Sequence, residues 1–231
     1  MGDTYGENIK LNIFGESHSE EIGMTLEGIP AGEVIDREEL NAFMMRRAPG
    51  RNDYSTTRRE KDIPVFKKGI AEAAGKPQDA QDIRQLTTDG TAITTVLKNE
   101  DIRSGDYEKF RNIPRPGHAD LTAALKYGNG SPEGAASGGG KFSGRMTAPL
   151  CIAGGICKQL LAKEGIEVIS RIYSIKDIED QGELTESTAA KSFPTVNEEQ
   201  GDKMLALIKE CKSKGDSVGG VVECLCRGIP A

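Results

Sequence analysis

Residues 145–163 read Arg145-Met-Thr-Ala-Pro-Leu-Cys-Ile-Ala-Gly-Gly-Ile-Cys-Lys-Gln-Leu-Leu-Ala-Lys163, and this stretch predicts the fold most strongly. It is apolar over most of its length, and Pro149 stands where a proline suits the first turn of a helix. Its two adjacent glycines permit close packing against a neighbouring element. We therefore predict a buried central helix over residues 145–163, preceded by a glycine-rich run at residues 137–145.

Strands and helices are predicted to alternate on both sides of this helix. Alternating apolar residues or β-branched content predict strands at residues 9–14, 22–27, 63–70, 91–98, 166–173 and 218–227. Asp36 is expected to cap a helix over residues 37–46, because Glu39 follows three residues later as in a capping box. After an acidic excursion at residues 175–195, an amphipathic helix is expected over residues 197–212.

The composition indicates a globular protein from a reducing compartment. The chain has 231 residues and a net charge of −6, so any anion must be bound by a local cluster of bases. Five cysteines without a CxxC pair, and only two histidines, favour a reduced cytoplasmic protein over a disulfide framework or a zinc site. Neither a signal peptide nor a membrane-spanning run is recognisable. Cys224 and Cys226 are expected to be small buried hydrophobes on one face of the last strand, without a function.

Both histidines lie in polar turns that contain glycine. His18 belongs to Gly15-Glu-Ser-His18, and His118 belongs to Arg115-Pro-Gly-His-Ala-Asp120. A histidine can give and take a proton near neutral pH, so both are candidates for acid–base chemistry. The alternatives are two ordinary surface histidines, or a zinc site completed by neighbouring carboxylates.

Five arginines stand within the fourteen residues from Arg46 to Arg59. Guanidinium groups bind phosphate and carboxylate through paired hydrogen bonds, so this segment is a candidate anion site. Some of these arginines could instead serve the end of the helix and the solvent. A nucleic-acid interface is the rival function, and it is weakened by the acidic total and by the lack of interleaved aromatic residues.

The run from Ser137 to Arg145 could hold a phosphate or an electron-rich ring edge, because successive backbone amides and a helix N-terminus follow one another there. It does not match a Walker loop, since Ala135 and Phe142 stand where that motif requires Gly and Ser or Thr. The alternative is a flexible glycine loop.

Taken together, these segments resemble the chorismate synthase family. The resemblance rests on Gly15-Glu-Ser-His-Ser-Glu-Glu-Ile-Gly, Arg46-Arg-Ala-Pro-Gly, Arg103-Ser-Gly-Asp-Tyr, Arg115-Pro-Gly-His-Ala-Asp, residues 138–148, Gly215-Asp-Ser-Val-Gly-Gly and Arg227-Gly-Ile-Pro-Ala. These motifs stand in the family's order over essentially the whole chain. The resemblance implies an α+β fold that sandwiches helices between antiparallel sheets, and assembly as a homotetramer.

The same resemblance implies a lyase of the shikimate pathway of aromatic amino acid biosynthesis. It would convert 5-enolpyruvylshikimate 3-phosphate to chorismate and phosphate by an anti-1,4-elimination that requires reduced FMN, with NADPH as a possible reductant. No nucleic acid and no membrane is expected as a partner.

The family's site residues carry over by motif position. His18 would protonate the leaving phosphate, His118 would sit against the reduced flavin, and Ser17 would help to relay the substrate proton. The anionic substrate would be held by Arg47, assisted by Arg46 and Arg51, and FMN would contact Gly140, Lys141, Phe142 and Ser143. Lys141-Phe142 departs from the family's more common Arg-Ser, and Asp53 stands where many members carry an arginine.

Family members continue past the Gly-Ile-Pro-Ala stretch into a C-terminal part with further site residues. Residues 1–231 are therefore expected to be the N-terminal portion of a single domain that is incomplete at the C-terminus. The alternative to an active lyase is a non-catalytic remnant that binds flavin or phosphate, or a subunit completed by another chain.

Overall fold

The computed structural model describes residues 4–50, 52, 54, 58–71, 83–100, 113–127 and 137–230. The chain divides into two compact units. The first comprises Met1–Ala48 and Arg58–Cys157, and the second comprises Pro49–Thr57 and Lys158–Ala231.

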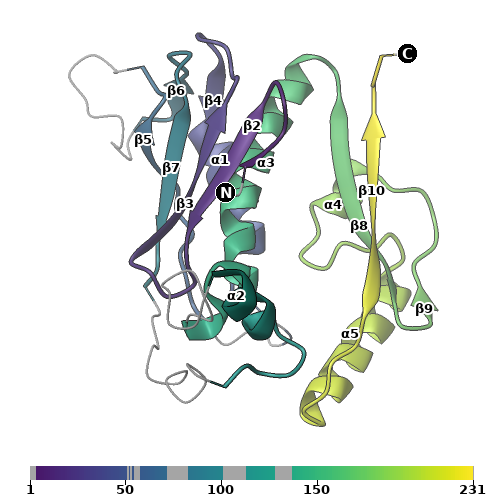
Figure 1. The fold of residues 1–231 in the computed structure, drawn as a ribbon. Helices are drawn as coiled ribbons and strands as arrows, with labels where there is room; N and C mark the ends of the chain where they lie inside the picture. The colour runs from purple at the N-terminus through teal and green to yellow at the C-terminus, as the bar shows by residue number, and fades with distance from the viewer. Residues whose placement is uncertain are drawn as a thin grey trace. The chain divides into compact units, whose positions relative to one another are not determined.

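A five-stranded antiparallel sheet forms the centre of the first unit (Figure 1). Its strands, in spatial order, are β1 (Thr4–Tyr5), β2 (Lys10–Gly15), β3 (Glu21–Glu27), β7 (Ile93–Lys98) and β5 (Val65–Lys68). Ile22, Met24 and Leu26 alternate along β3 and are all buried, as the period of two requires for a strand with one face in the core. A two-stranded sheet pairs β4 (Val34–Asp36) with β6 (Gln85–Thr87).

Helix α1 (Arg37–Arg47) begins at the predicted cap. One carboxylate oxygen of Asp36 accepts hydrogen bonds from the backbone N–H groups of Glu38 and Glu39, at 2.8 and 3.0 Å. The bond from Glu39 is the main cause that lowers the pKa of Asp36 below its ordinary value. Leu40 and Met44 on this helix are fully buried.

Helix α3 (Thr147–Lys163) packs closely against α1, and it follows two 3₁₀ segments, Ser137–Phe142 and Gly144–Met146. A Cβ at Gly155 would lie only 2.6 Å from Leu40 Cδ1 and 3.0 Å from Phe43 Cδ1, so glycine is what permits this approach. The short helix α2 (Asp120–Tyr127) completes the first unit. Within the described residues, no helix is both long and apolar enough to cross a membrane.

The second unit is built on a three-stranded antiparallel sheet with the order β10-β8-β9. Its elements are β8 (Glu167–Ile175), β9 (Ile178–Glu179), α4 (Glu186–Ala189), α5 (Glu198–Ser213) and β10 (Gly220–Arg227). Arg171 is buried on β8 and donates to Asp180 at 3.3 Å, to the Gly182 carbonyl at 2.9 Å and to Glu223 at 2.6 Å. These bonds tie β8 to β10 and to the chain that follows β9.

The predicted α+β class and the six predicted strands are confirmed, as are the helices that begin after Asp36 and near residue 197. Two expectations are corrected. Cys224 and Cys226 are exposed, because β10 turns this face away from the small core of its own unit. The helix predicted from residue 145 begins at Thr147, and it is buried on one side rather than all round, since Leu150 is 46% exposed.

Candidate functional site

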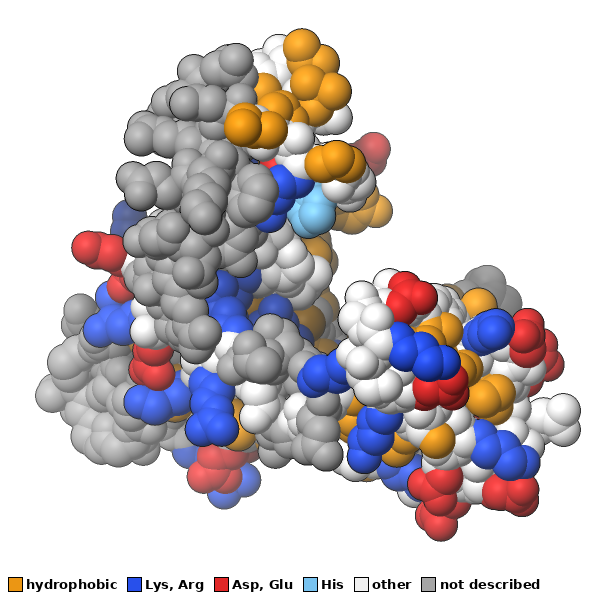
Figure 2. Space-filling view, turned by 90° about the horizontal axis from the view of Figure 1, so that it is seen from below, with side chains coloured by type: hydrophobic (Ala, Val, Ile, Leu, Met, Phe, Trp, Pro, Cys, Tyr) orange, Lys and Arg blue, Asp and Glu red, His pale blue; other side chains and the backbone are white. Residues whose placement is uncertain are grey.

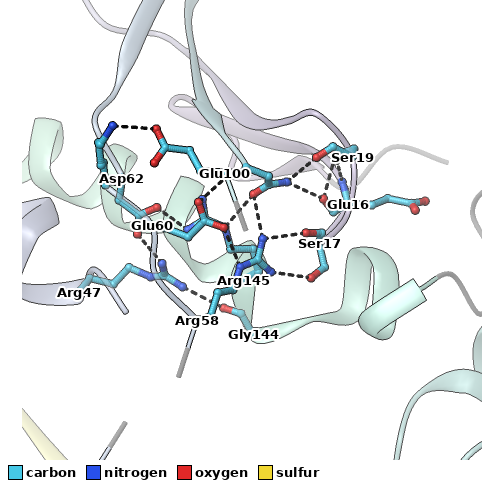
Figure 3. Close-up of polar contacts among 12 residues, drawn as sticks. Glu16, Ser17, Ser19, Arg47, Arg58, Glu60, Asp62, Glu100, Gly144 and Arg145 are labelled. Carbon is cyan, nitrogen blue, oxygen red and sulfur yellow. Dashed lines mark hydrogen bonds and ion pairs between the residues drawn. The ribbon is translucent and has the colours of Figure 1, made fainter. Parts of the chain in front are cut away.

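A buried cluster of three arginines and two carboxylates lies in the first unit (Figure 3). We call it the arginine–carboxylate cluster, and it consists of Arg47, Arg58, Glu60, Asp62, Asn99 and Arg145. Its members come from the end of α1, from the extended segment before β5, from the residue after β7 and from the 3₁₀ turn before α3. Within these six residues, the guanidinium groups outnumber the carboxylates by one.

Asp62 joins two of the arginines. Its Oδ2 accepts from Arg47 Nη1 at 2.7 Å, and its Oδ1 accepts from Arg145 Nη1. The carboxylate is completely buried, whereas the Arg47 side chain is 21% exposed and the Arg145 side chain is 3% exposed. One carboxylate therefore connects an arginine at the edge of the cluster with one in its interior.

Glu60 holds the third arginine. Its Oε1 accepts from Arg58 Nε at 2.7 Å, and its Oε2 accepts from the backbone N–H of Glu100 at 2.8 Å. Arg145 Nη2 lies 4.0 Å from the same Oε2 and makes no hydrogen bond to any described residue. This buried N–H group is thus a donor that the described part of the chain leaves unused.

The turn between β2 and β3, which contains the predicted Ser17 and His18, is fixed by this cluster. Arg58 donates from Nη1 to Ser17 Oγ at 3.2 Å and from Nη2 to the Ser17 carbonyl at 3.1 Å. Asn99 Nδ2 donates to the Ser19 carbonyl at 2.7 Å. Ser17 is buried and His18 is half-buried, so the histidine stands in a turn whose backbone is held on both sides.

The glycine-rich run meets the same turn. The Gly140 carbonyl accepts from the backbone N–H of Ser17 at 3.1 Å and from that of Ser143 at 3.3 Å. Arg47 Nη2 lies 3.3 Å from both the Gly144 carbonyl and Thr147 Oγ1. Three segments that are far apart in the sequence therefore come together here.

His118 lies in the turn before α2 and is exposed. Its Nδ1 is 3.1 Å from the Pro116 carbonyl. Arg115 braces the turn, because its Nε and Nη2 donate to Asp120 at 2.7 and 3.0 Å. The hydrogen bond from the Arg115 side chain is the main cause that lowers the pKa of Asp120.

Lys141 and Phe142 form an aromatic and cationic patch with the end of α2. Lys141 Nζ lies 4.6 Å from the centroid of the Tyr127 ring, and the Tyr127 and Phe142 rings are 6.3 Å apart. Phe142 is 46% exposed. On the face shown in Figure 2, hydrophobic and basic side chains gather beside an exposed histidine.

The structure brings some of the predicted residues together and leaves others apart. Ser17 and Ser143 both donate to the Gly140 carbonyl, and Arg47 reaches the neighbouring Gly144 carbonyl. Lys141 and Phe142 are linked to α2 through Tyr127. Arg46 is exposed with its guanidinium 6.0 Å from the centroid of the Phe43 ring, outside the described bonds of the cluster. Arg51 lies outside the described residues.

Sequence reasoning missed three members of the cluster, Glu60, Asp62 and Asn99. It placed Arg58 and Arg145 inside candidate segments but gave them no specific role. A signal was present for some of them. All five positions from 58 to 62 are charged shortly before a strand, and in an extended chain positions 58, 60 and 62 fall on one side. Asn99 had no comparable signal.

Comparison with known proteins gives a consistent result. The family model for chorismate synthase matches residues 9–231. The chain is similar to the chorismate synthase of Lancefieldella parvula, with 38% identity over 249 residues that cover 100% of this chain and 61% of the relative. It is also similar to the chorismate synthase of Korarchaeum cryptofilum, with 34% identity over 99% of this chain and 60% of the relative.

A solved structure supports the fold. A crystal structure of chorismate synthase superimposes with a TM-score of 0.66 at 22% identity, over 97% of this chain and 59% of that chain. The likeness concerns the fold alone. The chain spans about three fifths of the length of the relatives that it matches.

Proposed function

The chain belongs to the chorismate synthase family, and from this premise we propose that it takes part in the conversion of 5-enolpyruvylshikimate 3-phosphate to chorismate and phosphate. The observation that carries the proposal is the meeting of the Ser17 turn, Arg47 and the glycine-rich run at one arginine–carboxylate cluster. The substrate carries a phosphate and a carboxylate, which are the groups that arginine binds best.

Arg47 is the arginine proposed to bind the substrate's anionic groups. It is part of the cluster yet its side chain is 21% exposed, so its guanidinium can be reached from outside while its orientation is fixed. Arg46 is proposed to assist from the preceding position, where it is exposed. Arg51 is likewise proposed to assist in binding the substrate, on the basis of its position in the sequence after Arg46-Arg-Ala-Pro-Gly.

His18 is proposed to donate a proton to the leaving phosphate. Negative charge develops on the bridging oxygen as the carbon–oxygen bond breaks, and a nearby acid stabilises that charge. The turn that carries His18 is fixed by Arg58 and Asn99, which limits how far the ring can move from a productive position. Ser17, adjacent and buried, is proposed to take part in the same proton relay.

His118 is proposed to exchange a proton through Nε2. A carbonyl oxygen only accepts hydrogen bonds, so the contact with Pro116 requires a proton on Nδ1. In the neutral ring, Nε2 then carries the lone pair and can accept a proton. The bonds between Arg115 and Asp120 hold the turn that presents it.

The residues at the glycine-rich run fit a flavin mononucleotide. Lys141 offers a cation for a phosphate, Gly140 provides backbone with a positive φ of 52°, and Phe142 and Tyr127 offer aromatic surface for a flat ring. Ser143 is proposed to complete the set. Reduced FMN, when bound, would supply the electron-rich group that this elimination requires.

The test is phosphate release from 5-enolpyruvylshikimate 3-phosphate, measured without oxygen in the presence of reduced FMN. We expect release that depends on the reduced flavin, and a loss of about a hundredfold or more in each of His18→Ala and His118→Ala. Thr122→Ala, an exposed change on α2, is the matched control and should keep full activity. Full activity in both histidine variants would contradict the proposal.

The same experiment separates the alternative function. Quenching of flavin fluorescence or binding of the substrate without any phosphate release would support a non-catalytic binding protein, or a subunit that another chain completes. From the family resemblance we also propose that the protein is a homotetramer, that it is cytoplasmic and that it uses NADPH as reductant. Light scattering of the purified protein tests the first of them.

A further inference from the structure

The segment from Arg58 to Asp62 directs every second side chain into the arginine–carboxylate cluster. Glu60 and Asp62 are buried and Arg58 is half-buried, whereas Arg59 and Lys61 are exposed. This alternation is the period of an extended chain, although no strand ladder holds these residues. Figure 3 shows the Arg58, Glu60 and Asp62 side chains within the same group of polar contacts as Ser17 and Arg145.

Asp62 adopts a backbone conformation that points to a special role. Its φ is +50°, in the left-handed region that residues other than glycine rarely occupy. Aspartate and asparagine tolerate this region better than other side chains do. The strained conformation persists because the surrounding contacts determine it, and here those contacts are two arginines on the two oxygens of one carboxylate.

The consequence for Arg47 is a fixed orientation. Its Nη1 is bound by Asp62 at 2.7 Å, and its Nη2 lies 3.3 Å from the Gly144 carbonyl and from Thr147 Oγ1. The ion pair with Asp62 is the shortest of these contacts and the one that carries charge. Without it, the long arginine side chain would be free to adopt other rotamers at the partly exposed edge of the cluster.

We propose that Asp62 is a positioning residue that acts through Arg47, holding its guanidinium ready for the substrate's anionic group. This inference rests on the proposed function, because it assumes that Arg47 contacts the substrate. Asp62 itself, being completely buried and occupied by two arginines, does not touch the substrate.

A double-mutant cycle tests the inference on the full chain with reduced FMN. The variants are Asp62→Asn, Arg47→Lys and the double variant, and the readouts are kcat, KM and the Kd for 5-enolpyruvylshikimate 3-phosphate by calorimetry. Asparagine suits the positive φ and keeps the size, so Asp62→Asn removes chiefly the charge. We expect KM and Kd to rise about tenfold with kcat within about twofold, since a charged hydrogen bond that orients a binding group is lost.

The effects of the two substitutions on the Kd show whether Asp62 acts through Arg47. If Asp62 acts through Arg47, Asp62→Asn adds little to the Kd once Arg47→Lys is present. Additive effects, or an unchanged KM in Asp62→Asn, would overturn the inference. Lys61→Gln is the matched control, because Lys61 lies in the same segment but pairs with Glu100 at the surface, and it should leave KM unchanged.

A second variant at position 62 and the behaviour of the wild-type chain complete the test. Should Asp62→Asn not fold, Asp62→Glu keeps the charge and shifts the carboxylate by one methylene. The inference is supported if Asp62→Glu raises KM in the wild-type background but not in the Arg47→Lys background. It is rejected if Asp62→Glu leaves KM unchanged. If the wild-type chain neither binds nor converts the substrate, the proposed function fails, whereas normal turnover with additive variants rejects the role of Asp62 alone.

Discussion

Asp120 is a residue whose contribution to stability should depend on pH. Its carboxylate is buried and is bound by Arg115, which holds its pKa below the ordinary value of 3.8. A carboxyl whose pKa is lowered by folding stabilises the native state above its unfolded pKa, and this stabilisation is lost as the pH falls through the folded pKa. In Asp120→Asn, we therefore expect lower stability at neutral pH, by about 1–3 kcal/mol, because the charged partner of Arg115 is gone.

The pH dependence is the decisive part of that prediction. The stability difference between wild type and Asp120→Asn, measured by urea unfolding, should shrink as the pH is lowered from about 7 to below about 4. A difference that stays constant over this range would show that the carboxylate charge does not contribute. Asp202→Asn, an exposed change on α5, is the control and should behave as wild type.

The cysteines should differ in their reactivity with thiol reagents. Cys224 and Cys226 are exposed on β10, whereas Cys151 and Cys157 are partly buried on α3, where burial raises the pKa of both thiols. Desolvation raises the pKa of Cys224 as well, so the contrast lies in access to the reagent. Because Cys224 and Cys226 are exposed, we expect them to be modified first. Mass spectrometry of a time course with iodoacetamide checks the order, and equal rates at all four positions would contradict it.

The residues of the candidate site that the sequence predicted are those whose chemistry is visible locally. Ser17 and Arg47 stand in short polar motifs that contain histidine, arginine and glycine. Asp62 and Asn99 are ordinary polar residues in loops, and only contacts over long separations make them part of a site. Asp62 meets Arg145 across 83 residues of sequence, and Asn99 meets Arg145 across 46. A short stretch of sequence does not reveal contacts between residues so far apart in the chain.

At the scale of elements, the two glycines in the middle of α3 make a matched pair for a test of packing. A Cβ at Gly155 would meet the side chains of Leu40 and Phe43, while a Cβ at Gly154 would meet nothing within 4 Å. Gly154→Ala should stabilise the protein by about 0.5–1 kcal/mol, because alanine is the better helix former. Gly155→Ala should destabilise it by about 1–3 kcal/mol, because Leu40 and Phe43 must shift.

Thermal or urea unfolding of the two variants measures this difference. The helix propensity gain is the same in both, so the difference between them isolates the contact between α1 and α3. Equal stabilisation by both alanines would mean that the two helices are not in close contact at this point.

Elements that were predicted and elements that were missed differ mainly in length. The long strands β2, β3, β7 and β8 span six residues or more, enough for an alternating pattern to be recognised. β1 and β9 have two residues each, and β4 and β6 have three, so no period can be read from them. Helix α2 has eight residues, and two leucines four positions apart are the only large aliphatic residues in it, which is too short a pattern to establish a helical period.

At the scale of the whole molecule, the two units should differ in local stability. The largest fully buried side chains among the described residues all belong to the first unit, and they include Met24 on β3 and Leu97 on β7. The described core of the second unit's sheet is small, with Ile169, Leu184 and Ala189. Local opening costs less where less apolar surface is buried.

Hydrogen exchange followed by mass spectrometry checks this expectation. Amides in β3 and β7 should exchange more slowly than those in β8 and β10 by about a factor of ten or more. Equal protection of the two sheets would mean that the second unit gains stability from contacts beyond its own described core.

The carboxylate of Asp62, shared between Arg47 and Arg145, also has an evolutionary consequence. Replacing Asp62 alone would leave the buried guanidinium of Arg145 with one anion fewer, and replacing Arg145 alone would leave a buried carboxylate with one cation fewer. Either path passes through an intermediate of reduced fitness. Positions 47, 62 and 145 should therefore be inherited together, and lineages descended from this chain should change them jointly or keep all three.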